Sequence, residues 1–419
     1  MRNTCIITQK YKLFLHCDTV SRNIQSEYIA FLLSLTSIVK AAETPDAIYG
    51  DSLQISLLTC GPGKEVYSLY GHTAIRFHDV RNQQDLVINY GMFSFAQKNF
   101  ILRFIFGLTD YEMGIIPFDA FMKEYKREHR WVIEQVLNLS SADKRSIAMA
   151  IDANYLPENR VYRYNYFYDN CTTRARDLLA NNIQGTVVYK STPNTQTTFR
   201  SEIHQWNRQQ LWARFGNDLL LGIGADQNLT PEAQQFLPDS LRKDFQTAII
   251  RYQNGKERPL VAATHALYWP QEKTVAFSLT SFLCSPFAFI ALLFLITMSV
   301  WLLRKRVPKS YFWVVQAVRL LTGLCGILLT MMLFSQHPTV RLNLQILFLN
   351  PLNLLFFVPK LRQSKRFNQV MAGCYVLACV GALFQTYAEN VFLVAFILLF
   401  IQVATMKESN IIPRTQHGQ

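Results

Sequence analysis

The sequence predicts an α+β domain followed by an all-α membrane domain of about five helices. Half of the 419 residues are hydrophobic and only 17% are charged, whereas globular proteins average about 25% charged residues. From Phe277 onward, apolar runs follow one another with few charges, while residues 43–276 alternate between strand-like and helical patterns. The chain is therefore expected to divide near residue 276 into a domain outside the membrane and a domain within it.

The net charge of +13, from 42 Lys and Arg against 29 Asp and Glu, does not indicate a nucleic-acid partner. Such a partner requires a basic face on a folded soluble domain. Here eight basic residues form two short clusters between apolar runs, Arg304–Lys309 and Lys360–Arg366. Clusters of this kind mark the cytoplasmic loops of membrane proteins, so they predict topology.

Residues 1–42 have the pattern of a signal peptide region. Tyr28–Val39 is apolar and too short to span a bilayer, and Val39-Lys40-Ala41 behind it suits a cleavage site. The segment before it is unusually long, so an uncleaved anchor and a start codon downstream of Met1 both remain open.

Residues 43–276 are predicted to form one exported domain with an antiparallel sheet. Three segments have the composition and alternation of strands: Leu53–Cys60, Thr73–Phe77 and Leu86–Tyr90. Ser140 to Asp143 spell a capping box that opens a helix, and another helix is expected near Cys171. Strands that come first, with helices after them, are typical of an α+β domain.

The membrane domain is predicted at residues 277–405. It contains five apolar runs: Phe277–Leu303, Tyr311–Phe334, Leu342–Val358, Val370–Tyr387 and Val391–Thr405. A spanning helix needs about 20 apolar residues, so the last three runs are short, and a re-entrant course for one of them remains open. With the basic clusters in the cytoplasm, five crossings place the tail, residues 406–419, in the cytoplasm and the exported domain on the other side.

Cys171 has the sequence context of a catalytic nucleophile. It follows Asp169-Asn170, two residues that favour helix N-caps, and apolar positions after it recur with a helical period. The thiol is thus expected at a helix N-terminus, where partial positive charge favours the thiolate. A disulfide with Cys60, the other cysteine of the exported domain, is the alternative that an oxidising compartment suggests.

A histidine is the expected general base for this thiol. His72 follows Gly71 at the start of a predicted strand, where a polar ring can face a cleft. His78 lies about 20 Å further along the strand at about 3.3 Å per residue, so both cannot serve one thiol. Asn89, on the next strand, is the candidate that orients the imidazole. A purely structural role for His72 and for Asn89 remains open.

These segments resemble the exported domain of the Lnb family of bacterial membrane enzymes, which are lipoprotein intramolecular transacylases. The resemblance is carried by four segments: Leu57–Gly63, Tyr70–Thr73, Asn89–Gly91 and Tyr164–Arg174. In the C-terminal half, the polar motif His337-Pro338-Thr339, Asn343 and Asn350-Pro351-Leu352 is similar to one in the same family. The resemblance spans most of residues 50–405.

The resemblance implies a circularly permuted papain-like exported domain of the NlpC type, in which the histidine precedes the cysteine. It implies that Cys171 carries an acyl group as a thioester, that His72 is the base and that Asn89 takes the orienting place. The reaction would move an acyl chain from the diacylglyceryl group of a lipoprotein to its N-terminal amine and leave an N-acyl lyso-lipoprotein. The implied partners are lipid-modified proteins and lipids of the bacterial inner membrane, with no cofactor, metal or nucleic acid.

Tyr166 and Arg76 are the two candidate residues for substrate binding. The backbone N–H of Cys171 is the natural donor to an oxyanion, and Tyr166 is a second candidate. Arg76 shares a strand face with His72. The aromatic-rich stretch Phe93–Tyr125 either packs in the core or receives lipid chains at the membrane surface.

Two other functions remain open from the sequence. A membrane-tethered cysteine peptidase or amidase, acting on peptidoglycan or protein, would use the same cysteine and histidine. A non-catalytic membrane scaffold would instead join Cys60 and Cys171 in a disulfide. The membrane half favours a lipid substrate, because a cell-wall amidase needs no anchor of five segments.

Overall fold

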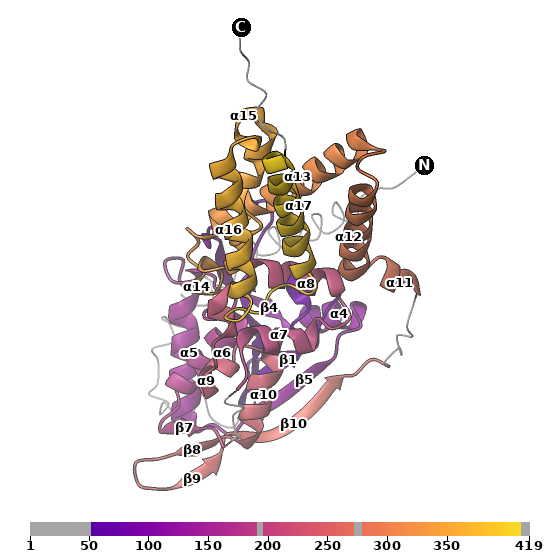
Figure 1. Cartoon of the computed structure of the whole chain (residues 1–419). Helices are drawn as coiled ribbons and strands as arrows, with labels where there is room; N and C mark the ends of the chain where they lie inside the picture. Colours follow the sequence, from indigo (N-terminus) through magenta and orange to yellow (C-terminus); the bar gives the residue numbers. More distant parts are fainter. Residues whose placement is uncertain (1–51, 191–195, 272–278, 412–419) are drawn as a thin grey trace. The chain divides into compact units, whose positions relative to one another are not determined.

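A seven-stranded antiparallel sheet is the main feature of the N-terminal half of this computed structural model, which describes residues 52–190, 196–271 and 279–411. The strand order is β10-β5-β1-β2-β3-β4-β6. Figure 1 shows the long strand β10 beside β5 at one edge of this sheet. The strands are β1 (Leu53–Cys60), β2 (His72–Asp79), β3 (Gln84–Met92), β4 (Asp110–Pro117), β5 (Val132–Leu137), β6 (Val161–Arg163) and β10 (Val261–Tyr268). The expected signal peptide region, residues 1–42, lies outside the described residues.

The three strands that the sequence predicts are confirmed as β1, β2 and β3. β1 is buried along almost its whole length because it lies inside the sheet, between β2 and β5. Its register with β2 pairs Cys60 with His72. The sheet thus brings the histidine to the same end as one of the two cysteines of the domain.

Helices cover the sheet, and three of those described, α5 (Ser141–Tyr155), α6 (Cys171–Asn181) and α7 (Phe199–Trp206), begin with capping boxes. The predicted box at Ser140 and Asp143 is confirmed at the start of α5, which lies beside α6 (Figure 1). The other helices of this half are η1 (Val66–Ser68), α3 (Phe100–Ile105), α4 (Phe118–Arg127), α8 (Leu211–Leu220), η2 (Ile223–Asp226), α9 (Pro231–Gln234) and α10 (Pro238–Thr247). A small second sheet joins β7 (Thr186–Val188), β8 (Ile249–Arg251) and β9 (Glu257–Pro259).

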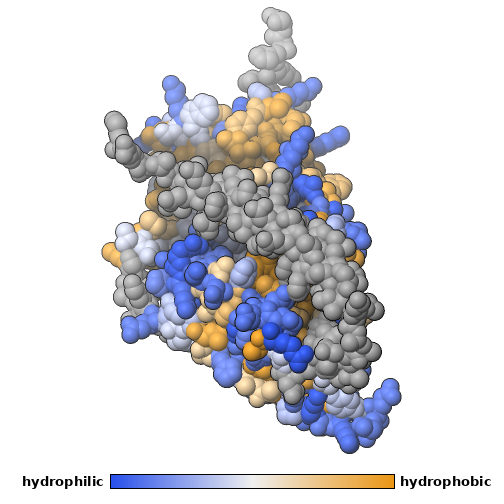
Figure 2. Space-filling model, turned by 180° about the vertical axis from the view of Figure 1, so that it is seen from behind, coloured by the Kyte–Doolittle hydropathy of each residue, from blue (hydrophilic) through white to orange (hydrophobic). Residues whose placement is uncertain are grey.

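The C-terminal half is helical from Leu279 onward. Among the residues that the structure describes, two segments are long and apolar enough to cross a membrane, Pro308–Met332 and Pro338–Phe357, and two shorter apolar helices are Pro286–Leu302 and Phe392–Lys407. Figure 2 shows hydrophobic residues gathered over this half, in the upper part of the view. The elements are α11 (Leu279–Leu283), α12 (Pro286–Leu302), α13 (Pro308–Met332), α14 (Pro338–Arg341), η3 (Leu344–Leu347), η4 (Pro351–Phe357), α15 (Pro359–Arg362), α16 (Lys365–Gly381) and α17 (Phe392–Ile411).

The third apolar run, Leu342–Val358, forms two short helices, η3 and η4, rather than one helix, and the short helix α14 precedes it. Asn343 and Asn350 begin η3 and η4, since their side chains accept hydrogen bonds from the N–H groups of Gln345 (3.0 Å) and Leu352 (2.9 Å). η4 packs along α13, where Gly326 leaves room for its backbone. The polar motif of this run therefore has a structural role: it ends and restarts short helices.

Polar side chains of the C-terminal half bind main-chain carbonyls of the N-terminal half. Gln345 donates to the carbonyl of Asp218 (2.9 Å), and Asn343 donates to that of Leu219 (2.8 Å). Because these groups are buried, each bond satisfies a carbonyl that water cannot reach.

The loops between α13 and α14 and between α16 and α17 also contact the N-terminal half. The N–H of Gln336 donates to the carbonyl of Phe106, and the side chain of Gln385 donates to that of Leu221. The two basic clusters lie at the opposite helix ends.

Candidate active site

Asn170 fixes the start of α6 in one position. Its side chain accepts hydrogen bonds from the N–H groups of Thr172 (2.8 Å) and Thr173 (3.0 Å), and the Thr173 hydroxyl accepts one from the N–H of Asn170 (2.9 Å). The amide nitrogen of Asn170 donates to the carbonyls of Tyr166 and Phe236. This capping box satisfies the N–H groups of Thr172 and Thr173 and places Cys171 as the first residue of the helix.

The structure brings Cys171, His72 and Asn89 together. The hydroxyls of Thr73 and Thr172 lie 3.1 Å apart and join α6 to β2, and the side chain of His72 lies close enough to Cys171 to lower the pKa of its thiol. The Nε2 of His72 lies 2.5 Å from the side-chain oxygen of Asn89. Because a carboxamide oxygen only accepts, Nε2 carries the hydrogen in this bond and leaves Nδ1 for the thiol.

The electrostatics of this pair favour an ionised thiol. Burial raises the pKa of Cys171, but the charge and hydrogen bond of His72, with bonds from Thr73 and Thr172, outweigh it and lower the pKa from 9.0 to about 7. Burial lowers the pKa of His72, and Cys171 and Asn89 more than offset this, so that the net shift is upward. The two groups together favour a thiolate and an imidazolium near neutral pH, which is the form of a catalytic cysteine.

A bulge in β3 lets the main chain pass close to the thiol. The register of β3 with β4 shifts between Asn89 and Met92. Within the bulge, Gly91 has a φ of +85°, and a side-chain carbon there would lie 3.7 Å from the Cβ of Cys171. A bulge of this type re-aims the residues beside it, which places the Asn89 side chain on His72.

Three tyrosines that precede α6 lie around the thiol. Tyr162, Tyr164 and Tyr166 alternate along the chain. Burial raises the pKa of each well above its usual range, and the charge of Cys171 is among the further causes. The hydroxyls of Tyr162 and Tyr166 are buried and have no hydrogen-bond partner among the described residues. Such hydroxyls are available to a bound ligand. The sequence indicated Tyr166 alone, and the alternation Tyr-Arg-Tyr-Asn-Tyr is the signal that adds the other two.

Arg76, the second residue predicted to bind substrate, forms its ion pairs with residues of the sheet. Its guanidinium lies 2.6 Å from a carboxylate oxygen of Asp85, 3.0 Å from one of Glu134 and 3.6 Å above the ring of Phe118. These contacts satisfy its charge within the fold. The expectation that Arg76 binds substrate remains a prediction, and this environment does not favour it.

Cys60 and Cys171 are free thiols, so the disulfide expected for a scaffold is not formed. Cys60 is 1% exposed, and burial raises its pKa to about 12. Within the described ranges, no group of three His, Cys, Asp or Glu side chains is arranged to hold a metal ion.

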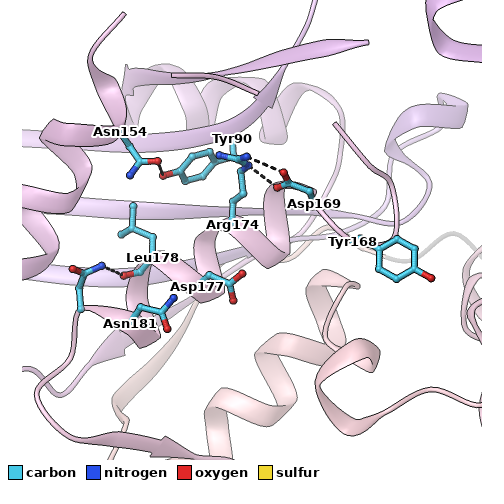
Figure 3. Close-up of a pocket in the computed structure, with 9 residues that line it drawn as sticks. Tyr90, Asn154, Tyr168, Asp169, Arg174, Asp177, Leu178 and Asn181 are labelled. Carbon is cyan, nitrogen blue, oxygen red and sulfur yellow. Dashed lines mark hydrogen bonds and ion pairs between the residues drawn. The ribbon is translucent and has the colours of Figure 1, made fainter. Parts of the chain in front are cut away.

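A groove of about 500 Å³ lies along α6, next to this site. Figure 3 shows the ion pair of Arg174 with Asp169 in the groove and the hydroxyl of Tyr90, which faces Asn154 at 3.5 Å. Its lining does not include Cys171. The groove is polar, and its one arginine is already paired, so it marks a surface beside the candidate site rather than the site itself.

Comparisons with known proteins match both halves of the chain. The Lnb N-terminal periplasmic domain matches residues 42–204, and the Lnb transmembrane domain matches residues 278–409. Together the two matches span more than half of the chain. Neither the comparison with curated proteins nor that with solved structures gave a match.

Proposed function

Since the chain belongs to the Lnb family, with a periplasmic domain followed by a transmembrane domain, we propose that it is a membrane-anchored cysteine acyltransferase. It moves an acyl chain from the diacylglyceryl group of a lipoprotein to the N-terminal amine of that lipoprotein. The acyl group passes through a thioester on Cys171, and the product is an N-acyl lyso-lipoprotein. The observation that carries this proposal is the contact of Cys171, at the start of α6, with His72, which Asn89 binds in turn.

The first half-reaction breaks the ester of the donor. The Cys171 thiolate attacks the acyl carbonyl, and a C–S bond forms while the carbonyl oxygen takes up negative charge. When the intermediate collapses, the ester C–O bond breaks, and the His72 imidazolium gives its proton to the glycerol oxygen that leaves. The enzyme then carries a thioester, and its imidazole is neutral.

The second half-reaction forms the amide. The N-terminal amine of the lipoprotein attacks the thioester carbonyl, and neutral His72 accepts the proton that the amine loses. The C–S bond breaks, and the thiolate and imidazolium are restored. One ester is exchanged for one amide, so the atoms balance without water and without a further reactant.

Both tetrahedral intermediates carry an oxyanion that needs donors. The N–H of Cys171 is in the first turn of α6, where backbone donors have no acceptor within the helix. The buried, unpartnered hydroxyl of Tyr166 is the second donor in this proposal. Both lie on the segment that the capping box of Asn170 holds in place, so they are preorganised.

The order of the parts supports a permuted papain-like fold for the periplasmic domain. His72 and Asn89, from β2 and β3, precede Cys171, from α6. The finer topology follows the same proposal: a signal peptide region at residues 1–42, the catalytic domain at 43–276, five crossings at 277–405 and a cytoplasmic tail at 406–419. The position of the two basic clusters, at the helix ends that do not contact the domain, supports a cytoplasmic side for them.

A cysteine peptidase or amidase would use the same thiol and imidazole. The difference lies in the substrate, and the transmembrane domain favours one that stays in the bilayer. Contacts such as Gln345 with the carbonyl of Asp218 hold the periplasmic domain against the membrane helices. A soluble peptide substrate gives no reason for this attachment.

The test is mass spectrometry of lipoprotein N-termini in a bacterial strain that lacks its own N-acyltransferase. With this chain, we expect N-acylated lyso-peptides, and with Cys171→Ala, at equal membrane abundance, unchanged diacyl peptides. Fully triacylated products would show that a separate phospholipid donates the acyl chain and would contradict the intramolecular route. Diacyl N-termini that the wild-type chain leaves unchanged would refute the proposed function.

A further inference from the structure

An apolar surface lies on the periplasmic domain around α3. The aromatic patch, as we call it, is formed by Tyr67, Phe93, Phe95, Phe100, Ile101, Leu102 and Phe104. None of the residues of α3 is buried, and Ile101 is 74% exposed. Apolar side chains scattered singly over a surface need no explanation, but a continuous patch of this kind marks a binding surface.

The rings of the patch touch one another in sequence. The ring centroids of Tyr67 and Phe95 lie 6.1 Å apart, those of Phe95 and Phe100 lie 5.1 Å apart, and those of Phe100 and Phe104 lie 6.4 Å apart. Arg103, the one charged residue of α3, turns away to an ion pair with Asp110. The patch therefore presents a continuous apolar face without a free charge on α3.

One end of the patch meets the transmembrane domain. The N–H of Gln336, just after α13, donates to the carbonyl of Phe106 (2.9 Å), and the rings of Phe104 and His337 lie 6.4 Å apart. Phe334, beside them, is 74% exposed. The apolar surface of the membrane helices thus continues into the aromatic patch.

A tryptophan marks the same boundary at another point. The Nε1 of Trp212, on α8, donates to the carbonyl of Cys284 (2.7 Å), just before α12, and its ring is exposed. Tryptophans with an apolar ring and a bonded N–H gather where membranes meet water. Because Cys284 precedes α12 and Gln336 follows α13, both contacts lie at helix ends that face the periplasmic domain.

The other end of the patch reaches the thiol. The rings of Phe93 and Tyr111 stack at 4.7 Å, and those of Tyr111 and Tyr164 at 4.0 Å. Phe93 stands two residues after Gly91, which approaches Cys171 closely. An unbroken series of rings therefore leads from the membrane helices to the candidate nucleophile.

We propose that the aromatic patch lies against the outer leaflet and receives the acyl chain of the membrane-bound substrate, which passes along these rings to Cys171. The inference rests on the proposed function and adds to it the place where the lipid enters. The occupant is an acyl chain because the patch is apolar, bears no free charge on α3 and is continuous with the lipid-facing helices.

The first measurement asks whether the patch contacts lipid. The variants are Phe104→Trp and, as a matched control, Met149→Trp, on α5, since Met149 is an exposed apolar residue outside the patch. In nanodiscs with brominated phospholipids, we expect the added tryptophan fluorescence to be quenched at position 104 and not at position 149, relative to the wild-type chain. Equal quenching, or none at position 104, would overturn the inference.

The second measurement asks whether the patch serves acyl transfer. Ile101→Ser with Leu102→Ser should raise KM for a diacylglyceryl lipopeptide with long acyl chains by more than about tenfold, since two contacts with the chain are lost. The KM for a lipopeptide with six-carbon chains and the kcat for both substrates should change little, and Met149→Ser should match the wild type. An equal rise in KM for both lipopeptides would indicate a site for the protein part, and an unchanged KM would indicate no role, so either result overturns the inference. A wild-type chain that transfers no acyl group would instead refute the proposed function and this inference with it.

Discussion

The two cysteines of the periplasmic domain lie close together, yet their surroundings give them opposite chemistry. Cys60 is the register partner of His72 at the end of β1, and Cys171, at the start of α6, has its pKa lowered by His72. Burial raises the pKa of both thiols. It leaves Cys60 at about 12, whereas His72 and bonds from Thr73 and Thr172 bring Cys171 to about 7.

The difference shows that closeness to the histidine is not sufficient to lower the pKa of a cysteine. Cys60 packs in an apolar cluster with Leu58, Ala74 and Val87, and its neighbours Tyr125 and Arg130 only reduce the effect of burial. Cys171 has both the nearby imidazole of His72 and the first position of a helix, which favours negative charge. The helix start is therefore a second feature, besides His72, that separates Cys171 from Cys60.

The largest expected effect is a difference in alkylation between the two thiols. At pH 7, a pKa of about 7 leaves about half of Cys171 as thiolate, and a pKa of about 12 leaves about 10⁻⁵ of Cys60. We expect iodoacetamide to modify Cys171 at least about a thousandfold faster than Cys60, since the thiolate is the reacting form. Mass spectrometry of the two peptides measures this ratio, and half-maximal reactivity of Cys171 should fall near pH 7.

Unfolding provides the control for this ratio. In denaturant both thiols return towards their ordinary pKa of 9.0, so the two rates should come within about tenfold of each other. If Cys60 reacted as fast as Cys171 in the folded protein, the predicted difference between their pKa values would be contradicted. The same would follow if Cys171 reacted only after unfolding.

Removal of the imidazole is expected to make the two thiols more alike. In His72→Gln, burial is no longer outweighed, so the pKa of Cys171 should rise to 9.0 or higher and its thiolate fraction at pH 7 should fall about fiftyfold or more. The alkylation rate at pH 7 reports this change, and acyl transfer should fall by about two to four orders of magnitude. His78→Gln, a change on the same strand, should leave both rates unaltered. An unchanged alkylation rate in His72→Gln would show that the helix start alone sets the pKa.

Local patterns in the sequence predicted much of this arrangement. Strand alternation gave β1, β2 and β3, and the N-cap residues before Cys171 gave the start of α6, because both depend on neighbours along the chain. The same patterns selected Cys171, His72 and Asn89, which the fold brings together. Their catalytic roles remain predictions that the variants above test.

The features that the sequence did not predict depend on distant contacts. β10 pairs with β5 across much of the domain, and no local pattern selects that partner. Arg76 was predicted to bind substrate because it shares a face of β2 with His72, but it forms ion pairs with Glu134 on β5 and Asp85 on β3. The third apolar run broke into short helices because Asn343 and Asn350 cap them, although its composition resembles that of a short spanning helix.

A smaller change is expected at Asn89, which acts on the thiol through His72. The bond to Asn89 raises the pKa of His72, so Asn89→Ala should lower that pKa and move the alkaline limb of the pH–rate profile of acyl transfer to lower pH. We expect about a tenfold loss of rate, since the imidazole keeps its place on the strand but loses its orientation. Asn89→Asp, whose carboxylate still accepts from Nε2, should move the same limb to higher pH. Limbs that stay in place in both variants would limit Asn89 to a structural role.

The smallest expected effect is a difference between the capping boxes of α5 and α6. Ser140→Ala removes the cap of α5 and should cost about 1 kcal/mol of stability, whereas Asn170→Ala also leaves the buried carbonyls of Tyr166 and Phe236 without a donor and should cost about 2 kcal/mol. Thermal unfolding of the purified chain ranks the two costs.

Only the cap of α6 holds the thiol. Asn170→Ala should therefore slow alkylation of Cys171 about threefold, since a frayed first turn weakens its contact with His72, and Ser140→Ala should leave the alkylation rate unchanged. If both variants slowed alkylation in proportion to their loss of stability, the reactivity of Cys171 would follow the stability of the whole domain. The position of the thiol at the start of α6 would then add nothing to its reactivity beyond the effect of His72.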